Sequence, residues 1–519
     1  MWNGGIGTYV KAAEESHDEV GDRTNDAVRI NGAELRARVA VEGGNLGFTQ
    51  LGRIEYTLLG GLMNTDFIDN SAGVDCSDHE VNIKILLNTI METGDLTLKQ
   101  RNQLLASMGD EVASLVLQNN YHQNEAVSFL SLLSSRNMGL YIRYLDVQEA
   151  AGKINRQLEF LPDRKALLER RANQQGLTRP EVSVLLSYSK IILKEQILHS
   201  DLLQDPSLEH FIKNAFPTVL CKKYSQFIFK HRLRDEILAT QLSNHLVSHM
   251  GIVFVHRMKD ETGADVASIM RAFLVASHIF NIAPLYADIE GLDYAVDMAL
   301  QCQMSDEITR LVRRATRWLL RNWREPMHIT TMIAHFEPQI KLLIKRLPRL
   351  LLGSDKEDVD MRRDQLIAAK VPEEMASRIA AVRSMYHALN IVQAATKQST
   401  DVYHVAQIYF ALVDRLDLHW FRDKINDHPV THRWSVLAKA AFKSDLDWIQ
   451  RELTMSVIGF TVAAKSTTTK VNAWLEQHAK SVARWGRVLE DLRSEDVSDF
   501  SIILLGIREL FDLAESARS

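Results

Sequence analysis

Cysteine is scarce in this sequence, which has only 3 cysteines in 519 residues. Cys76, Cys221 and Cys302 lie far apart and form no C-x-x-C pair. Their spacing excludes a disulfide framework and a zinc knuckle, and it favours a reducing compartment.

Long hydrophobic runs are missing as well, since the longest, MSVIGFTVAA at 455–464, is about half the length that crosses a bilayer. We therefore predict a cytoplasmic protein without a membrane span.

The chain also lacks an excess of basic residues. It has 61 basic and 66 acidic residues and a net charge of -5, which argues against a general nucleic-acid binder. Hydrophobic residues make up 46%, an ordinary share for a globular protein. A chain of this length is too long for one compact core, and we expect about two to four folding units.

The familiar catalytic and nucleotide-binding motifs are absent. GGIGTY at 4–9 is followed by Val10 where the last glycine of G-x-G-x-x-G would stand, and GGNLG at 43–47 does not match either. The glycine-rich opening, WNGGIGTY after Met1, is a turn with no element before it. Because such turns normally connect packed elements, it predicts that the chain is the carboxy-terminal piece of something larger.

Glycine content divides the sequence into two parts, because 12 of the 24 glycines fall at or before Gly73. In this first part, 37–42 (ARVAVE) and 66–69 (DFID) are predicted to be buried strands. Each is followed by small and polar residues, and ligands gather at the carboxy ends of strands in α/β sheets. Asn45 lies in the first of these loops, and its amide can both donate and accept hydrogen bonds.

Beyond Glu80 the apolar residues recur at helical spacing, so the sequence predicts a mostly α protein. Thr178 and Glu181 have capping-box spacing at the start of one helix. Breaks are expected near residues 160, 355 and 400. Further helices are predicted at 81–90, 98–121, 236–250, 264–280, 307–323, 372–389 and 401–416.

The acidic stretch IDNSAGVDCSDHE at 68–80 permits several interpretations. Ser77 and Glu80 have capping-box spacing, so a helix is expected to begin there. The cap could be purely structural, or the helix amino terminus could receive an anion such as a carboxylate. Asp75, Asp78 and His79 could be metal ligands, but acidic residues at a helix start are expected from the dipole alone, and we predict no metal. Cys76 is expected to be a small buried residue.

A stripe of arginines is predicted on one later helix. A phosphate-rich partner could use such a stripe, but a solvated face paired with nearby acids is the commoner explanation. The stripe consists of Arg310, Arg314, Arg317, Arg321 and Arg324.

Five long motifs stand out: WNGGIGTYVKA, VEGGNLGFTQLGRIEY, NTDFIDNSAGVDCSDHEVNIKILL, LTRPEVSVLLSYSKI and RLRDEILATQLSNHLV. Together they resemble one protein family, the large bacterial NAD-specific glutamate dehydrogenases. The resemblance covers essentially the whole chain. It implies that residues 1–100 are the carboxy-terminal part of the catalytic domain, a remnant of an α/β dinucleotide-binding (Rossmann-like) domain, and that 101–519 are a helical carboxy-terminal region.

The same resemblance implies roles for individual residues. VEGGN is similar to the family's E-G-A-N strand end, which implies NAD binding by Gly43, Gly44 and Asn45, with Gly44 departing from Ala. NSAGVDCSDHE is similar to an N-A-G-G-V turn that leads into a helix whose early serine contacts the glutamate side chain. This implies substrate binding by Asn70, Gly73 and Ser77.

The implied reaction converts L-glutamate, NAD and water to 2-oxoglutarate, ammonia and NADH. The family's acid-base lysine and aspartate cannot be placed on this chain, so no catalytic residue is assigned and the chain alone is expected to be inactive. Self-association of the parent protein is expected. The alternative is a helical assembly or regulatory module without catalysis.

Overall fold

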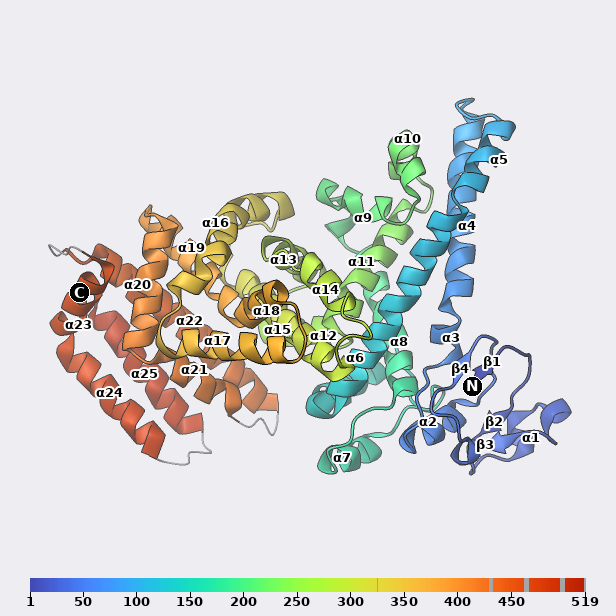
Figure 1. Cartoon of the computed structure of the whole chain (residues 1–519), viewed down its shortest axis with the longest axis horizontal. Helices are drawn as coiled ribbons and strands as arrows, with labels where there is room; N and C mark the ends of the chain where they lie inside the picture. Colours follow the sequence, from blue (N-terminus) through green and yellow to red (C-terminus); the bar gives the residue numbers. More distant parts are fainter. Residues whose placement is uncertain (324, 429–432, 462–465, 495–499, 518–519) are drawn as a thin grey trace. The chain divides into compact units, whose positions relative to one another are not determined.

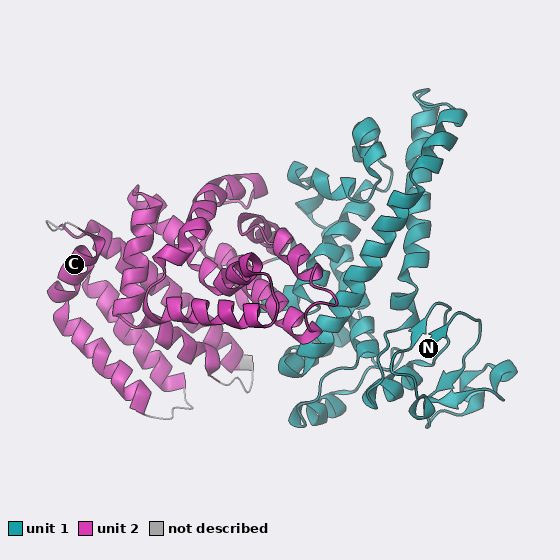
Figure 2. Cartoon of the chain, viewed as in Figure 1, with its two compact units in different colours: residues 1–260, 265–267 teal, residues 261–264, 268–519 magenta. Residues whose placement is uncertain are grey.

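A computed structural model describes residues 1–323, 325–428, 433–461, 466–494 and 500–517. The chain forms two compact units (Figures 1 and 2). Unit 1 contains Met1–Asp260 and Asp265–Ala267, and unit 2 contains Glu261–Ala264 and Ser268–Ser519. The described residues are mostly helical, which confirms the predicted fold class at that level. The division into regions at residue 100 stays a prediction.

Unit 1 begins with four two-residue strands that form two separate parallel pairs. β1 (Trp2–Asn3) pairs with β4 (Val41–Glu42), and β2 (Val10–Lys11) pairs with β3 (Ile30–Asn31). The strand predicted at 37–42 is confirmed over its last two residues. Among the described residues these pairs do not join into one sheet, so the dinucleotide-binding remnant stays a prediction.

The second predicted strand, at 66–69, is wrong, because these residues form the short helix α3 (Asp66–Asp69). The Asp66 carboxylate accepts hydrogen bonds from the backbone N–H groups of Phe67, at 2.9 Å, and Leu46, at 2.8 Å. Aspartate side chains that bond to nearby backbone N–H groups favour turns and helix starts over strands. The aspartates at both ends of DFID therefore favour a helix more strongly than its two apolar residues favour a strand.

In unit 1 the helices predicted at 81–90 and 236–250 are confirmed, whereas the one predicted at 98–121 is divided between residues 107 and 109. The capping box at Thr178 is confirmed, since its hydroxyl accepts from the Glu181 N–H and the Glu181 carboxylate accepts from the Thr178 N–H. Residues 151–163, between α6 and α7, are not helical, while the predicted subdivision of the region near 160 stays a prediction. The α-helices of this unit other than α3 are α1 (His17–Val20), α2 (Gln50–Leu58), α4 (Ser71–Glu92), α5 (Leu98–Ser107), α6 (Gly109–Ala150), α7 (Arg164–Ala172), α8 (Arg179–Leu198), α9 (Glu209–Lys213), α10 (Thr218–Phe229), α11 (Arg234–Met250) and most of α12 (Phe254–Thr262).

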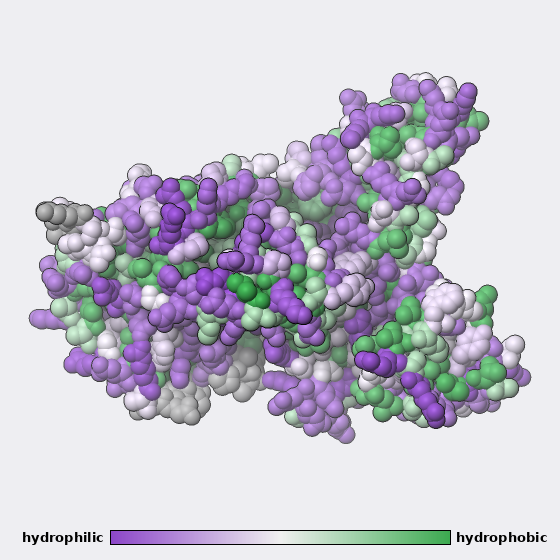
Figure 3. All heavy atoms as spheres, in the orientation of Figure 1, coloured by the Kyte–Doolittle hydropathy of each residue, from purple (hydrophilic) through white to green (hydrophobic). Residues whose placement is uncertain are grey.

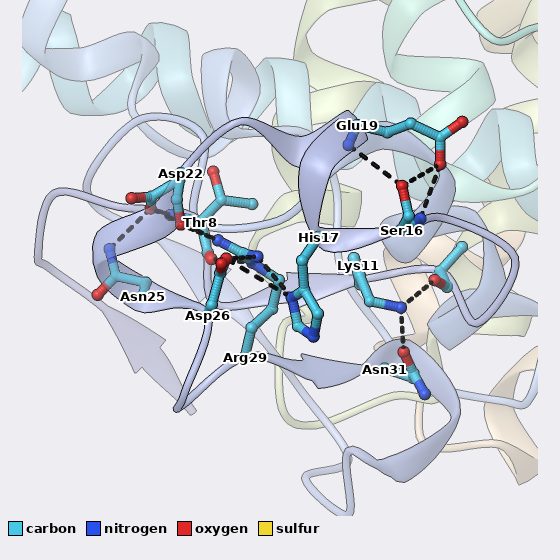
Figure 4. Close-up of polar contacts among 11 residues, drawn as sticks. Thr8, Lys11, Ser16, His17, Glu19, Asp22, Asn25, Asp26, Arg29 and Asn31 are labelled. Atoms are coloured by element: carbon cyan, nitrogen blue, oxygen red, sulfur yellow. Dashed lines mark hydrogen bonds and ion pairs between the residues drawn. The ribbon is translucent and has the colours of Figure 1, made fainter.

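A buried arginine holds the first residues of unit 1 together (Figure 4). Arg29 is 7% exposed and donates to the Thr8 carbonyl at 2.8 Å and to the Asp26 carboxylate at 2.6 Å. The Asp22 carboxylate accepts from the Thr8 N–H at 2.8 Å. Buried polar groups need such partners, so this network supplements the small apolar cluster of the segment.

Large hydrophobic side chains are exposed at unusual density in residues 1–81, which supply 14 of the 30 exposed large hydrophobics among the described residues. Trp2 is 72% exposed, Ile6 96% and Leu46 64%. Figure 3 shows hydrophobic side chains gathered on the viewed face of this segment. Contiguous apolar surface of this kind usually marks a contact with another polypeptide segment.

Unit 2 consists of helices joined by short non-helical segments in its described residues. Non-helical residues lie at 351–352, just before α17, and at 399–401, between α19 and α20, while the predicted subdivision of the region near 355 and 400 stays a prediction. The helices are most of α13 (Val266–Ile279), then α14 (Ala283–Glu290), α15 (Met298–Asn322), α16 (Ile329–Leu350), α17 (Gly353–Ala368), α18 (Glu373–Met385), α19 (His387–Gln398), α20 (Val402–Arg415), α21 (Leu418–Asp427), α22 (Arg433–Gly459), α23 (Thr467–Gln477), α24 (Ala479–Ser494) and α25 (Phe500–Ser516).

Membrane-spanning potential is weak in the described part of the chain. No single helix there has the length and apolar composition of a membrane span. The bent pair α13 and α14 meets those two criteria only when its helices are taken together.

Candidate functional site

The carboxy end of β4 is held by a buried ion pair. Glu42 is fully buried, and its carboxylate accepts from Arg53 Nε at 2.7 Å and from Arg53 Nη2 at 3.0 Å. It also accepts from the Phe48 N–H at 3.0 Å. Burial raises the pKa of Glu42, while Arg53 acts in the opposite direction. Through these hydrogen bonds Glu42 therefore holds the loop from 43 to 48 in place, and neither of its carboxylate oxygens is free to bind a ligand.

The glycines after β4 are required by close packing against the amino-terminal loop. A Cβ atom on Gly43 would lie 2.6 Å from the Trp2 Nε1 atom, and one on Gly44 would lie 2.6 Å from the Gly5 carbonyl oxygen. Their N–H groups both donate to the Asn3 carbonyl, at 2.8 and 3.0 Å. Since those donors are used internally, a role for these two glycines at NAD would come from their small size, and that role stays a prediction.

Asn45 and Asn70, predicted for two different ligands, are brought together. The Nδ2 group of Asn70 donates to the Oδ1 atom of Asn45 at 3.2 Å, and Asn45 is exposed. Among the described residues, none accepts a hydrogen bond from the Nδ2 group of Asn45. This donor is therefore available to a carbonyl or hydroxyl oxygen of a ligand.

The helix after Asn70 begins earlier than predicted. α4 starts at Ser71, with Asn70 at the N-cap position, so the predicted turn through Gly73 and the capping box at Ser77 are both wrong. Ser77 lies in the second turn, where its hydroxyl donates to the Gly73 carbonyl at 3.4 Å. The reason is α3, which already turns the chain, so that α4 follows it at once. Asn70, Gly73 and Ser77 consequently lie on one face of the helix.

The neighbouring acidic residues have structural partners. Asp75 accepts from Asn119 Nδ2 at 2.8 Å, and its other oxygen lies 3.8 Å from Nε2 of the buried His79. In the described ranges, no group of three or more His, Cys, Asp or Glu side chains is arranged to hold a metal ion. Cys76 is exposed, which corrects the expectation of a buried thiol, because α4 turns that position toward solvent.

A row of asparagines on α6 supports this site and was not found by sequence reasoning. Asn120 donates to the Ile68 carbonyl at 3.0 Å and to the Ser71 hydroxyl at 2.8 Å. Asn124 accepts from Asn64 at 2.6 Å. The signal was the run NNYHQN, in which amides recur on one helix face.

Arg179 and Asp69 are two charged residues that Asn64 joins next to this site. Both guanidinium contacts of Arg179 to Asn64 Oδ1 are short, at 2.8 and 3.1 Å, and Asn64 also donates to Asp69 at 2.8 Å. Burial raises the pKa of Asp69 and lowers the pKa of Arg179. Asp69 in turn accepts from the Glu42 N–H at 3.0 Å, so one network links the end of β4 to the start of α4.

The arginine stripe on α15 is only partly a solvated face. Arg310 is half-exposed and pairs with Asp306 at 2.8 Å, as predicted. Arg317 is 7% exposed and pairs with the buried Glu261 at 2.6 Å, so the expectation of a solvated side chain is wrong there. Arg324 lies outside the described residues.

Comparison with known proteins points to one family in both parts of the chain. A family model for the carboxy-terminal region of glutamate dehydrogenase matches residues 174–512. A second, for the catalytic domain of bacterial NAD-glutamate dehydrogenase, matches residues 1–130.

Three relatives carry the name NAD-specific glutamate dehydrogenase. The protein from Pseudomonas aeruginosa is 46% identical over 518 residues, which are 100% of this chain and 32% of that protein. The one from Halomonas elongata is 45% identical over 516 residues, 99% of this chain and 32% of the relative. The one from Mycobacterium tuberculosis is 36% identical over 510 residues, 98% of this chain and 31% of the relative. The chain therefore spans about a third of the length of these relatives.

Proposed function

Because the chain belongs to the bacterial NAD-specific glutamate dehydrogenase family, we propose that it forms part of an enzyme that oxidises L-glutamate with NAD. Glutamate and water yield 2-oxoglutarate and ammonia, and NAD is reduced to NADH. NAD supplies the hydride acceptor, since its nicotinamide ring takes the hydride from the α-carbon of glutamate. All three relatives are named as NAD-specific, which supports NAD as the cofactor.

The hydrogen bond between Asn45 and Asn70 is the observation that carries this proposal. Asn45 presents a free amide donor at the end of β4, which suits the carboxamide or a ribose hydroxyl of NAD. Asn70, Gly73 and Ser77 form the adjoining face of α4, where the Ser77 hydroxyl is exposed. We propose that this face binds the side-chain carboxylate of glutamate, so that substrate and cofactor meet where the two asparagines touch.

The residues around the Asn45–Asn70 contact suit a binding face that a further segment completes. Residues 1–81 expose many large hydrophobic side chains, and they hold the short parallel strand pairs. We propose that residues 1–100 are a remnant of the dinucleotide-binding domain and that the rest of the catalytic domain packs on the apolar surface of residues 1–81. The lysine and aspartate of the family's acid-base chemistry would come from that part.

Kinetic measurements on variants of the enzyme that contains this chain test the residue roles, because each variant should affect glutamate or NAD but not both. Ser77→Ala should raise KM for glutamate about 10- to 100-fold with little effect on NAD, because a hydrogen bond to a charged group contributes about 1.5–3 kcal/mol. Asn45→Ala should weaken NAD binding and leave glutamate affinity nearly unchanged. Ser114→Ala is the matched control, since Ser114 is an exposed helical serine that donates to the carbonyl four residues before it, at 2.9 Å.

Measuring the stability of the Ser77→Ala variant distinguishes an effect on substrate binding from an effect on folding. Ser77 is not a helix cap, so its loss should not destabilise α4 measurably. Equal effects of Ser77→Ala on glutamate and NAD, or an unchanged KM for glutamate, would refute the substrate role.

An assembly or regulatory role for the helical region is the second candidate. A cavity lined by basic side chains of α15 and α22 favours it, because these residues lie outside 1–130, which the catalytic-domain model matches. The basic residues are Arg314, Arg317, Arg321, Lys443 and Arg451. Light scattering of the chain measures self-association, and a strictly monomeric chain would contradict assembly through this region.

A further inference from the structure

Unit 2 contains a cavity of about 80 Å³ lined by α15 and α22. Positions 314, 317 and 321 of α15 and positions 443, 447 and 451 of α22 recur at helical spacing, so each row faces the same gap. The cationic lining residues are Arg314, Arg317, Arg321, Lys443 and Arg451.

Two of these cations already have partners that satisfy them. Arg317 pairs with Glu261 at 2.6 Å, and both side chains are buried. Arg321 donates to the Ser444 hydroxyl at 2.6 Å and to the Glu261 carbonyl at 2.7 Å. The one carboxylate in the lining, Asp447, accepts a hydrogen bond from the Tyr386 hydroxyl. The lining and Glu261 together thus hold five cationic groups against two carboxylates.

The other three cations keep unused donors. Arg314 lies over the Tyr386 ring at 3.8 Å, and a stacked guanidinium leaves its N–H edge open. Within the described part of the chain, no hydrogen bond or ion pair joins the Lys443 ammonium to another residue. Arg451 is 4% exposed and donates to Asn390 Oδ1 at 3.0 Å and to Asn322 Oδ1 at 3.3 Å, but its buried Nε has no acceptor among the described residues. A buried donor of this kind is costly without a partner.

The electrostatic environment of Lys443 reflects this imbalance. Its pKa is lowered to about 6, first by burial and then by the positive charges of Arg314, Lys439, Arg317 and Arg313. Without an anion Lys443 is therefore largely uncharged near pH 7, and a bound anion would offset the repulsion, raise this pKa and restore the positive charge.

We propose that this cavity binds a phosphate group, either as inorganic phosphate or as the phosphoryl end of a small metabolite. The planar guanidinium of arginine matches the spacing of phosphate oxygens, and lysine adds a compact positive charge. The cavity has room for several water molecules, hence for one tetrahedral oxyanion.

Calorimetric titration of the whole chain with sodium phosphate tests this proposal, with sodium chloride keeping the ionic strength constant. We expect saturable binding at one site. Lys443→Met and Arg314→Leu should each weaken it at least tenfold, because each removes a donor and a charge from the cavity. Arg310→Met is the charge-matched control, since Arg310 lies on the same helix, pairs with Asp306 and does not line the cavity.

A second titration, with glycerol 3-phosphate, separates the two sources of the group. Tighter binding than phosphate identifies a metabolite's phosphoryl end, and equal or weaker binding identifies inorganic phosphate. Absence of saturable binding to folded protein would overturn the proposal, as would wild-type affinity in Lys443→Met. Equal competition by acetate would also overturn it. Circular dichroism verifies folding of each variant, and neither glutamate nor NAD is needed, so the result is independent of the proposed catalytic role.

Discussion

Replacing the buried carboxylate of Glu42 should loosen the loop that carries Asn45. In Glu42→Leu, Arg53 Nε and Nη2 and the Phe48 N–H lose their acceptor at once. Breaking a buried ion pair by removing one partner costs about 3–5 kcal/mol. Arg53 keeps Asp66, 3.2 Å from Nη2, so we expect the lower end of that range, about 3 kcal/mol. Since about 1.4 kcal/mol is a factor of ten, the open fraction of this segment should rise about 100-fold or more.

Hydrogen exchange followed by mass spectrometry measures that opening locally. A chain with two compact units does not give one free energy of unfolding, whereas peptides covering residues 41–58 report on this loop alone. Glu80→Gln is the control, because Glu80 is exposed and, among the described residues, pairs only with Lys84 along the same helix. It should leave exchange in 41–58 unchanged.

The double variant Glu42→Leu/Arg53→Leu separates the buried charge from simple packing. An apolar pair leaves no uncompensated guanidinium, so it should be milder than the sum of the two single changes. Exchange in Glu42→Leu that matches Glu80→Gln would refute the reasoning, and so would strict additivity in the double variant.

Two further predictions concern pH and activity. His419 lies between Asp355 and Asp423, and their hydrogen bonds raise its pKa to about 10. The folded state therefore holds the proton more tightly than the unfolded state, so the stabilisation is complete below about pH 6.5 and is lost as the pH rises through about 10. His419→Gln should thus lower the denaturation midpoint of unit 2, followed by tryptophan fluorescence, most at pH 6.5 and least at pH 10, because seven of the eight tryptophans lie in that unit. A difference that does not change with pH contradicts this. For activity, the purified chain should show no turnover with glutamate and NAD, because the acid-base lysine and aspartate of the family are not placed on it. Turnover above background would refute that expectation.

Local interactions explain what could be predicted along the chain. The capping box at Thr178 and the helices that follow it depend on side chains a few residues apart, and these contacts form in the predicted way. Where two local patterns competed, the prediction failed. The apolar pair in DFID suggested a strand, but Asp66 captures backbone N–H groups and starts a helix. The capping-box spacing at Ser77 was equally misleading, because α3 places the helix start at Ser71.

The sequence by itself determined the mostly helical class, most helix positions and, through long motifs, the family resemblance that the comparisons bear out. Only the tertiary structure decided which residues meet. The contact of Asn45 with Asn70 spans 25 positions, and the pairing of Arg317 with Glu261 spans 56. Such contacts depend on how separate elements pack, and burial then decides whether a charge is solvated or must find a partner. In the sequence, arginines at helical spacing look the same whether their side chains are solvated or buried and paired.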